Sequence, residues 1–304
     1  MTVGIIGLGL IGGSMAIDLK RRGFASRILG VEAEPVNAAA ALQIGLADEI
    51  VSFEECVDRS DIVVLSVPVG TAVRMLPEVL DRFAAGTASA EPESAGTGSV
   101  EQGEMPDGCR KIVIDVCSTK KNLVKAVEGH PMRRRYVATH PMAGTEYSGP
   151  WAAQPGLFDG RACIICNGDE SDRDAVEAVE RLYDCLNMRL TSMDAANHDV
   201  HTAYVSHISH ITSFALALTV LDKEKDEKHI FDLASGGFSS TVRLAKSNAD
   251  MWVPILSQNR DNVLRVMDTY IEKMNEFRDA ISSGDDGKIR ELIGEANRIK
   301  RIIR

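Results

Sequence analysis

Residues 2–14, TVGIIGLGLIGGS, decide the fold. The β-branched run at 3–6 predicts a buried strand, and the G-x-G-x-x-G spacing that starts at Gly7 predicts a tight turn into a helix over 10–22. The first glycine permits the turn, the second lets a pyrophosphate approach the backbone, and the third lets helix and strand pack closely. The helix N-terminus directs unpaired N–H groups at the phosphates. The predicted cofactor contacts of this turn are Gly7, Gly9, Leu10, Ile11 and Gly12.

The second strand ends at Glu32, 20 residues after Gly12. An acidic side chain there accepts hydrogen bonds from the adenosine ribose and would repel a 2′-phosphate. No Arg or Lys occupies positions 33–36, so NAD is favoured over NADP. The alternative is a structural glycine turn with an incidental surface glutamate. Ser14 either caps the first helix or contacts phosphate, and the sequence does not separate the two.

Short β-branched runs alternate with helical stretches through the first half of the chain. Strands are expected at 3–6, 28–31, 62–65, 111–115, 136–139, 162–166 and 188–191, and helices at 10–22, 34–44, 53–59, 69–83, 119–128 and 171–186. This alternation predicts an α/β fold, a Rossmann-like, doubly wound parallel sheet with helices on both faces. From residue 194 only helical patterns remain. We therefore expect an NAD-binding domain over 1–193, with a flexible insertion at 84–109, and an all-α domain over 194–304.

Ligands in open α/β sheets bind beyond the carboxyl ends of the strands. Ser66, Val67 and Pro68 end one strand and Ser118 follows the next, so we expect them to line the cofactor cleft. Ser118 could equally cap the helix that follows. His140 ends a later strand and can exchange a proton near neutral pH, as oxidation of an alcohol requires, although a lone histidine there is often structural.

Composition limits the partners of this 304-residue chain. Its 44 acidic and 34 basic residues give a net charge of −10, which disfavours nucleic acid and anionic membranes. The start MTVGIIGLG does not resemble a signal peptide, and the longest apolar candidate, 211–221, is too short to span a bilayer. The six cysteines are scattered, and Cys163 and Cys166 should point to opposite faces of one strand. We predict buried thiols, no metal site and a cytoplasmic protein.

The last two helices carry heptad-like apolar spacing. The positions are Val263, Met267, Tyr270, Met274, Phe277 and Ile281, then Ile289, Leu292, Ala296, Ile299 and Ile303. Such stripes pack helices side by side within one chain or between two. We favour a homodimer, because a helical half of about 110 residues gains core by pairing.

Basic and aromatic residues gather before the last helices. Arg243 offers a planar fork for a carboxylate and is followed by Lys246, although a solvated basic face is the simpler interpretation. Ser247 begins a capping box and could be a helix cap. His207 and His210, three apart on an apolar helix, are interpreted as pocket-lining or core residues rather than as metal ligands.

The chain resembles the prephenate/arogenate dehydrogenases of tyrosine biosynthesis over nearly its whole length. The resemblance rests on GLGLIGGS (7–14), DVCSTKKNL (115–123), THPMAGTEYSG (139–149), VSHISH (205–210) and GGFSSTVRLAKSNADMW (236–252). Two departures stand out. Cys117 replaces a glycine that many relatives carry before the serine, and Ser239 replaces a lysine found in some.

The resemblance implies NAD-dependent oxidation and decarboxylation of a ring-hydroxylated substrate by a homodimer. His140 would hydrogen-bond the C4 hydroxyl and accept its proton, Ser118 would contact the same hydroxyl or the nicotinamide, and Arg243 would bind a carboxylate. The other implied pocket residues are Thr145, Glu146, Ser206, His210, Ser247 and Trp252.

Two other functions remain open. A β-hydroxyacid dehydrogenase would share the two-domain plan but has a lysine followed by asparagine four residues on, whereas Lys246 is followed at that spacing by Asp250. A nucleotide-sensing protein without turnover would not need His140 and Arg243 together. No residue separates prephenate from arogenate.

Overall fold

The computed structural model describes residues 1–88, 110–225 and 230–302. Within these residues one sheet has the strand order β3-β2-β1-β4-β5-β6-β7-β8. The strands are β1 (Thr2–Ile6), β2 (Arg27–Val31), β3 (Glu49–Ile50), β4 (Ile62–Leu65), β5 (Ile112–Asp115), β6 (Tyr136–Pro141), β7 (Ala162–Cys166) and β8 (Arg189–Met193). The order reverses at β1, as in doubly wound dinucleotide-binding folds. The predicted fold class is therefore confirmed.

Helices cover both faces of the sheet. They are α1 (Leu10–Arg21), α2 (Pro35–Gln43), α3 (Phe53–Arg59), α4 (Val69–Ala88), α5 (Lys121–Ala126) and α6 (Arg173–Cys185). Along each strand, alternate side chains pack on α1 and α6 and the others pack on α3, α4 and α5. Because both faces are buried, the strands are nearly continuous runs of β-branched residues. Cys163 and Cys166 fall into these two opposite clusters, as their spacing predicts.

Three features differ from expectation. β7 runs antiparallel to β6, so the sheet is not wholly parallel. β3 has only two residues, too few for a periodic signal. The helix expected at 69–83 continues to Ala88, where alanines favour helix, so the first five residues of the expected insertion are helical. The remainder of that insertion, from residue 89, lies outside the described residues, as does Cys109.

The turn after β1 has the backbone that its glycines predict. Gly7 has a φ of 95°, a conformation that residues with a side chain rarely adopt. A Cβ on Gly12 would collide with the carbonyl oxygen of Gly7. Helix α1 can therefore begin directly beside the strand end, with its backbone open toward a ligand.

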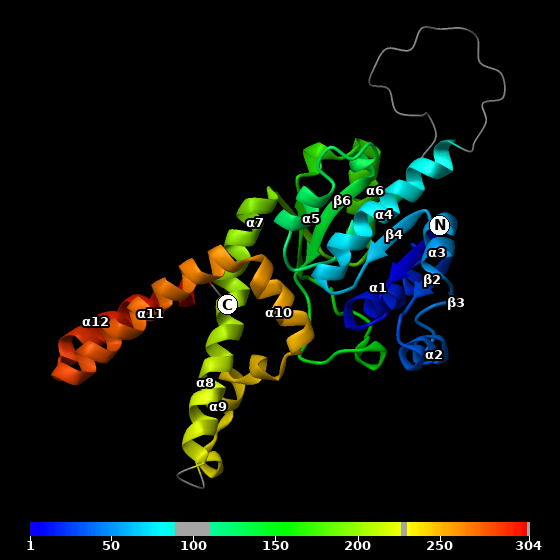
Figure 1. Cartoon of the computed structure of the whole chain (residues 1–304). Helices are drawn as coiled ribbons and strands as arrows, with labels where there is room; N and C mark the ends of the chain where they lie inside the picture. The colour runs from blue at the N-terminus through cyan, green and yellow to red at the C-terminus, as the bar shows by residue number, and fades with distance from the viewer. Residues whose placement is uncertain (89–109, 226–229, 303–304) are drawn as a thin grey trace.

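The second half of the chain is helical and extends away from the sheet (Figure 1). Its helices are α7 (Ala195–Thr202), α8 (Ile208–Glu224), α9 (Gly236–Thr241), α10 (Ala249–Gln258), α11 (Arg260–Ser283) and α12 (Asp286–Ala296). A π-helical turn, η4 (Ala203–His207), joins α7 to α8. On α11 and α12 large apolar side chains are exposed, including Met274, Ile281 and Ile293.

Helices α7 and α8 form one apolar element of 30 residues, Ala195–Glu224. The expectation of a stretch too short to cross a membrane concerned only 211–221, whereas the whole helix is long and apolar enough to cross a membrane by length and composition, although one such helix is weak evidence of a span. Its N-terminal turns bury the polar residues His198, Asp199 and Thr202 against the nucleotide-binding half. That end of the element is therefore part of the protein interior.

Candidate active site

A buried ion pair connects the carboxyl ends of β5 and β6. The Asp115 carboxylate accepts hydrogen bonds from Lys120 Nζ, from the Tyr136 hydroxyl at 2.7 Å and from Cys117 N at 3.0 Å. Lys120 Nζ also donates to the carbonyl oxygen of Thr139 at 2.6 Å. Both charged side chains are fully buried. This pair fixes the turn that carries Ser118 next to the strand end that carries His140.

His140 has a buried histidine and a buried carboxylate behind it. His140 Nδ1 lies 2.8 Å from His198 Nε2, and His198 Nδ1 lies 2.8 Å from Asp199 Oδ1. His140 comes from β6, whereas the other two come from α7. The site thus lies where the nucleotide-binding half meets the helical half.

Backbone groups hold the Asp199 carboxylate in place. Lys120 N donates to Oδ1 at 2.8 Å, and Lys121 N donates to Oδ2 at 3.0 Å. Asn259 Nδ2 donates to the Asp199 carbonyl oxygen at 2.6 Å and lies 3.2 Å from His207 Nδ1. These bonds leave Asp199 little freedom to rotate away from His198.

The His140 environment favours a neutral imidazole. Burial first, and then the nearby His198, Lys120 and His207, lower the pKa of His140 well below its ordinary value of 6.5. Burial also lowers the pKa of His198, although its hydrogen bond to Asp199 opposes this shift. A neutral imidazole at neutral pH can accept a proton, which is what a general base requires.

Arg243 and Glu146 face each other across the site. Arg243 Nη1 donates to Glu146 Oε2 at 3.2 Å, although the two residues are 97 positions apart. The Arg243 side chain is 51% exposed and that of Glu146 is 19% exposed. The pKa of Glu146 lies below its usual value because its own backbone N–H, and then Arg243, stabilise the carboxylate. Arg243 therefore retains exposed guanidinium surface for an anionic ligand.

Aromatic rings stack on the helical side of the site. The ring of His210 lies on Trp252 with centroids 3.6 Å apart, and His207 meets the same indole edge-on at 5.9 Å. His210 Nδ1 pairs with the carbonyl oxygen of Ser206 at 3.1 Å. Trp252 is buried and packs with the core under α4. Ser206, His210 and Trp252 therefore lie together in the structure.

The predicted cofactor residues line the carboxyl edge of the sheet. Glu32 Oε2 accepts from Leu8 N at 3.2 Å, which ties the end of β2 to the glycine turn. Cys117 Sγ lies 3.7 Å from the Val67 carbonyl oxygen, so the two cleft turns are in contact. The bare glycine turn and the acidic group at the end of β2 fit the pyrophosphate and ribose of NAD.

Three serines have roles other than capping. Ser14 Oγ accepts from Gln154 N at 3.0 Å, so it holds the segment after β6 instead of capping α1. The α5 N-cap is Lys120 and the α10 N-cap is Asn248, so Ser118 and Ser247 cap neither helix. Ser118 is partly exposed in the turn after β5.

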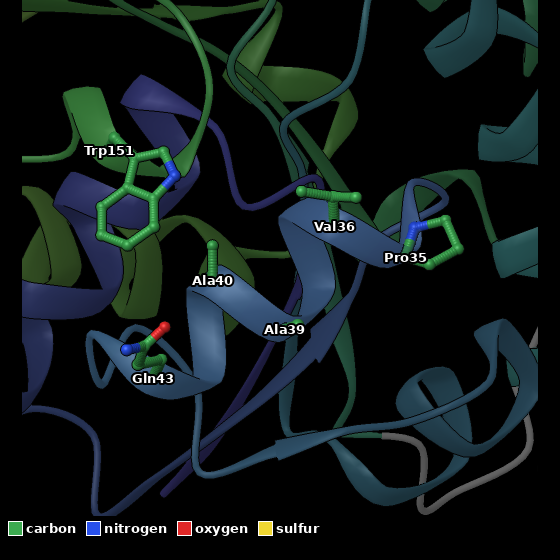
Figure 2. Close-up of a pocket in the computed structure, with 6 residues that line it drawn as sticks. All are labelled: Pro35, Val36, Ala39, Ala40, Gln43 and Trp151. Atoms are coloured by element: carbon green, nitrogen blue, oxygen red, sulfur yellow. The ribbon is translucent and has the colours of Figure 1, made fainter.

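A separate surface pocket of about 440 Å³ lies between α2 and the turn η2 (Pro150–Ala152). Its lining is Pro35, Val36, Ala39, Ala40, Gln43 and Trp151 (Figure 2). In Figure 2 the Trp151 ring lies over the face of α2 that carries Ala40 and Gln43. None of the candidate catalytic residues lines it.

Sequence reasoning missed Asp115, Lys120, His198 and Asp199 as parts of the site. His198 and Asp199 lie in a stretch without a recognised motif, and they meet His140 only in the folded chain. The available signal was a charged or polar residue at positions that the helical pattern buries.

Comparisons with known proteins place the chain in one family. The sequence profile described as "Prephenate dehydrogenase, nucleotide-binding domain" matches residues 15–87 and 108–192, and that described as "Prephenate dehydrogenase, dimerization domain" matches 194–295. A prephenate dehydrogenase from Bacillus subtilis (strain 168) is 31% identical over 286 residues, 93% of this chain and 71% of the relative. A cyclohexadienyl dehydrogenase from Zymomonas mobilis is 26% identical and covers 98% of this chain and 94% of its own.

Solved structures agree. The prephenate dehydrogenase of A. aeolicus, in complex with hydroxyphenyl propionate and NAD+, superposes with a TM-score of 0.81 at 28% identity. The match covers 99% of this chain and 97% of that one.

Replacing Lys120 with methionine should destabilise the protein by about 3–5 kcal/mol, because Asp115 is then a buried charge without its partner. Urea unfolding at fixed protein concentration measures the change. Lys121→Met is the matched control, since that side chain is exposed, and should change the free energy of unfolding by less than about 0.5 kcal/mol. Equal stability of the two variants would contradict the assigned role of the ion pair.

Proposed function

Because the chain belongs to the prephenate dehydrogenase family and catalyses the NAD-dependent oxidative decarboxylation of prephenate, we propose that His140 is the group that accepts the proton of the substrate hydroxyl. One observation carries this proposal. His140 lies buried at the carboxyl end of β6, where its lowered pKa favours the neutral imidazole, and its Nδ1 lies 2.8 Å from His198 Nε2. Nε2 is then the nitrogen left for a ligand.

In this proposal the hydroxyl proton of the substrate moves to His140 and later returns to the same oxygen. Bound NAD+ supplies the acceptor for the hydride from ring C4. The substrate O–H bond breaks and an N–H bond forms at His140 Nε2 as the carbon–oxygen double bond develops. Loss of the ring carboxylate as CO2 leaves its bonding electrons in the ring, and the oxygen then takes a proton back to become the phenol. His140 acts first as base and then as acid.

The remaining site residues have proposed roles in binding. Ser118 contacts the same hydroxyl or the nicotinamide, and Arg243 binds a substrate carboxylate with Glu146 holding its guanidinium. The other proposed pocket residues are Thr145, Ser206, His210, Ser247 and Trp252. The proposed cofactor residues are Gly7, Gly9, Leu10, Ile11, Gly12, Glu32, Ser66, Val67 and Pro68.

The proposed domains are an NAD-binding domain at 1–193 and a helical domain at 194–304. We propose that the helical domain pairs two copies into a homodimer, because its profile is that of a dimerization domain and the apolar stripes of α11 and α12 are exposed. A cytoplasmic location accords with the free, buried thiols of Cys56, Cys117, Cys163 and Cys166.

Formation of NADH or NADPH, measured with prephenate and with arogenate and with each cofactor, tests which substrate and cofactor the enzyme prefers. The account expects turnover of prephenate with NAD+. Binding of NAD+ without NADH production would favour a nucleotide sensor instead. Arogenate is the second candidate substrate, because the Zymomonas relative is a cyclohexadienyl dehydrogenase and the Arg243 site would bind a carboxylate of either compound.

His140→Asn should lower kcat by roughly 10²–10⁴, the usual contribution of a positioned acid–base group, with little change in KM. The asparagine keeps a polar side chain of similar size but cannot take up the proton. Steady-state NADH formation at saturating prephenate measures the effect. A kcat equal to that of the unchanged enzyme would refute the role of His140.

The pH profile should show the lowered pKa of His140. Since the base is the neutral imidazole and its pKa lies well below 6.5, kcat/KM for prephenate should stay level as the pH falls to 6.5 and decline only in more acidic buffer. Glu146, whose pKa is also lowered, stays ionised over this range. An acid limb with its midpoint at 6.5 or above would contradict the neutral, buried environment.

Arg243→Gln should mainly raise KM for prephenate. Hydrogen bonds to charged groups contribute about 1.5–3 kcal/mol, which corresponds to an increase of roughly 10- to 150-fold. The lower end is expected because the guanidinium is half exposed. Lys246→Gln on the same short helix, η6 (Arg243–Lys246), is the control and should change KM far less. Equal effects would indicate a general basic surface rather than a specific carboxylate contact.

A further inference from the structure

The proposed base on β6 and two buried residues of α7 form a continuous series of hydrogen-bonded groups. His140, His198 and Asp199 are 8%, 0% and 3% exposed, and each junction between them is 2.8 Å. Water has little access to either imidazole, so each ring nitrogen inside the series can exchange protons only with its neighbour.

The direction of the hydrogen bonds follows from the chemistry of the groups. Asp199 accepts from Lys120 N and Lys121 N, as an ionised carboxylate does, so His198 Nδ1 must carry the hydrogen that it donates to Asp199. A neutral His198 then has no hydrogen on Nε2, which accepts from His140 Nδ1–H. A neutral His140 is therefore left with an unprotonated Nε2.

We infer that His198 and Asp199 are positioning residues, which hold the Nε2 lone pair of His140 toward the substrate and share the charge that His140 acquires with the substrate's proton. This inference rests on the proposed role of His140. When Nε2 gains the proton, Nδ1–H of His140 points at His198 Nε2, and the hydrogen bond can strengthen or pass that proton on. Asp199 at the far end supplies the negative charge that stabilises a cationic imidazole pair.

The proton balance of the reaction explains why the hydrogen-bonded series His140–His198–Asp199 has little contact with water. Prephenate dianion and NAD+ give the hydroxyphenylpyruvate anion, CO2 and NADH, so charge and protons balance with none released. The proton taken from the hydroxyl is needed again when the ring oxygen becomes a phenol. A buried pair that holds it and returns it suits this reaction better than a relay to solvent.

The charges around His140 favour a nearby carboxylate that can offset a proton on its imidazole. Lys120 from the turn before α5 and His207 from η4 lie near His140, and both disfavour added positive charge there. Asp115 on β5 and Asp199 on α7 act in the opposite direction on His198. Since Asp115 is already engaged by Lys120, Asp199 is the carboxylate that can offset a protonated imidazole.

Two replacements of His198 separate the functions. Glutamine can place an oxygen near the Nε2 position and accept from His140 Nδ1, whereas phenylalanine offers no acceptor. We expect His198→Phe to lower kcat about 10²- to 10³-fold and His198→Gln to recover on the order of tenfold of that loss, with KM for prephenate and NAD+ nearly unchanged. His201→Gln is the matched control, since His201 is exposed on the same helix and its Nδ1 pairs with the carbonyl oxygen of Asn197.

The double variant His140→Asn/His198→Phe distinguishes this inference from the proposal beneath it. If His198 acts through His140, the double variant has the kcat of His140→Asn alone, because the second loss has nothing left to affect. If the two losses multiply, or if His198→Phe and His198→Gln are equally impaired, His198 has only a structural role and the inference fails. If His140→Asn retains full kcat, the base assignment itself fails.

Discussion

The ion pair between Asp115 and Lys120 is the constraint on which the site depends. It lies at the carboxyl edge of the sheet with both side chains fully buried, and its partners come from β5, β6 and the turn between β5 and α5. The backbone of Lys120 also donates to Asp199, which belongs to the helical half. Lys120 thereby contacts three parts of the site: the turn that carries Ser118, the end of β6 that carries His140, and helix α7. The Lys121 N–H, which donates to Asp199, and the Thr119 hydroxyl, which donates to Gln258 Oε1, also connect this turn to the helical half.

The same arrangement sets the electrostatics of the reaction. Burial first, then His198 and the buried Lys120, lowers the pKa of His140 and so favours a neutral imidazole, while Asp199 bonds to His198 on the far side. The net charge of −10 disfavours an anionic substrate and an anionic cofactor at long range. The positive end of α1 and the exposed face of Arg243 supply local positive potential within an acidic surface. The helical half, which matches the profile of a dimerization domain, also places His198 and Asp199 beside His140.

Much of this architecture follows from the sequence, because hydrophobic period and glycine spacing are local signals. The glycine turn, Glu32 and most strands were predictable within a residue or two, whereas the two-residue β3 and the antiparallel β7 were not, since strand direction depends on distant packing. The family resemblance implied that Glu146 and Arg243 both belong to the pocket, but it did not predict that they pair with each other. His198 lies 58 positions from His140, and no local pattern shows that the two meet. Capping, one of the two alternatives for Ser118 and Ser247, does not occur, because the N-caps of α5 and α10 are Lys120 and Asn248.

The most direct test of the account is the protonation state of His140, read by ¹⁵N NMR of histidine-labelled enzyme saturated with NAD+ at neutral pH. His140→Asn identifies its resonances. The account predicts a neutral ring with hydrogen on Nδ1 and none on Nε2, and an Asp199→Asn variant should disturb that pattern, since an amide can donate where the carboxylate only accepts. A ring protonated at Nε2, or one indifferent to Asp199, would contradict it.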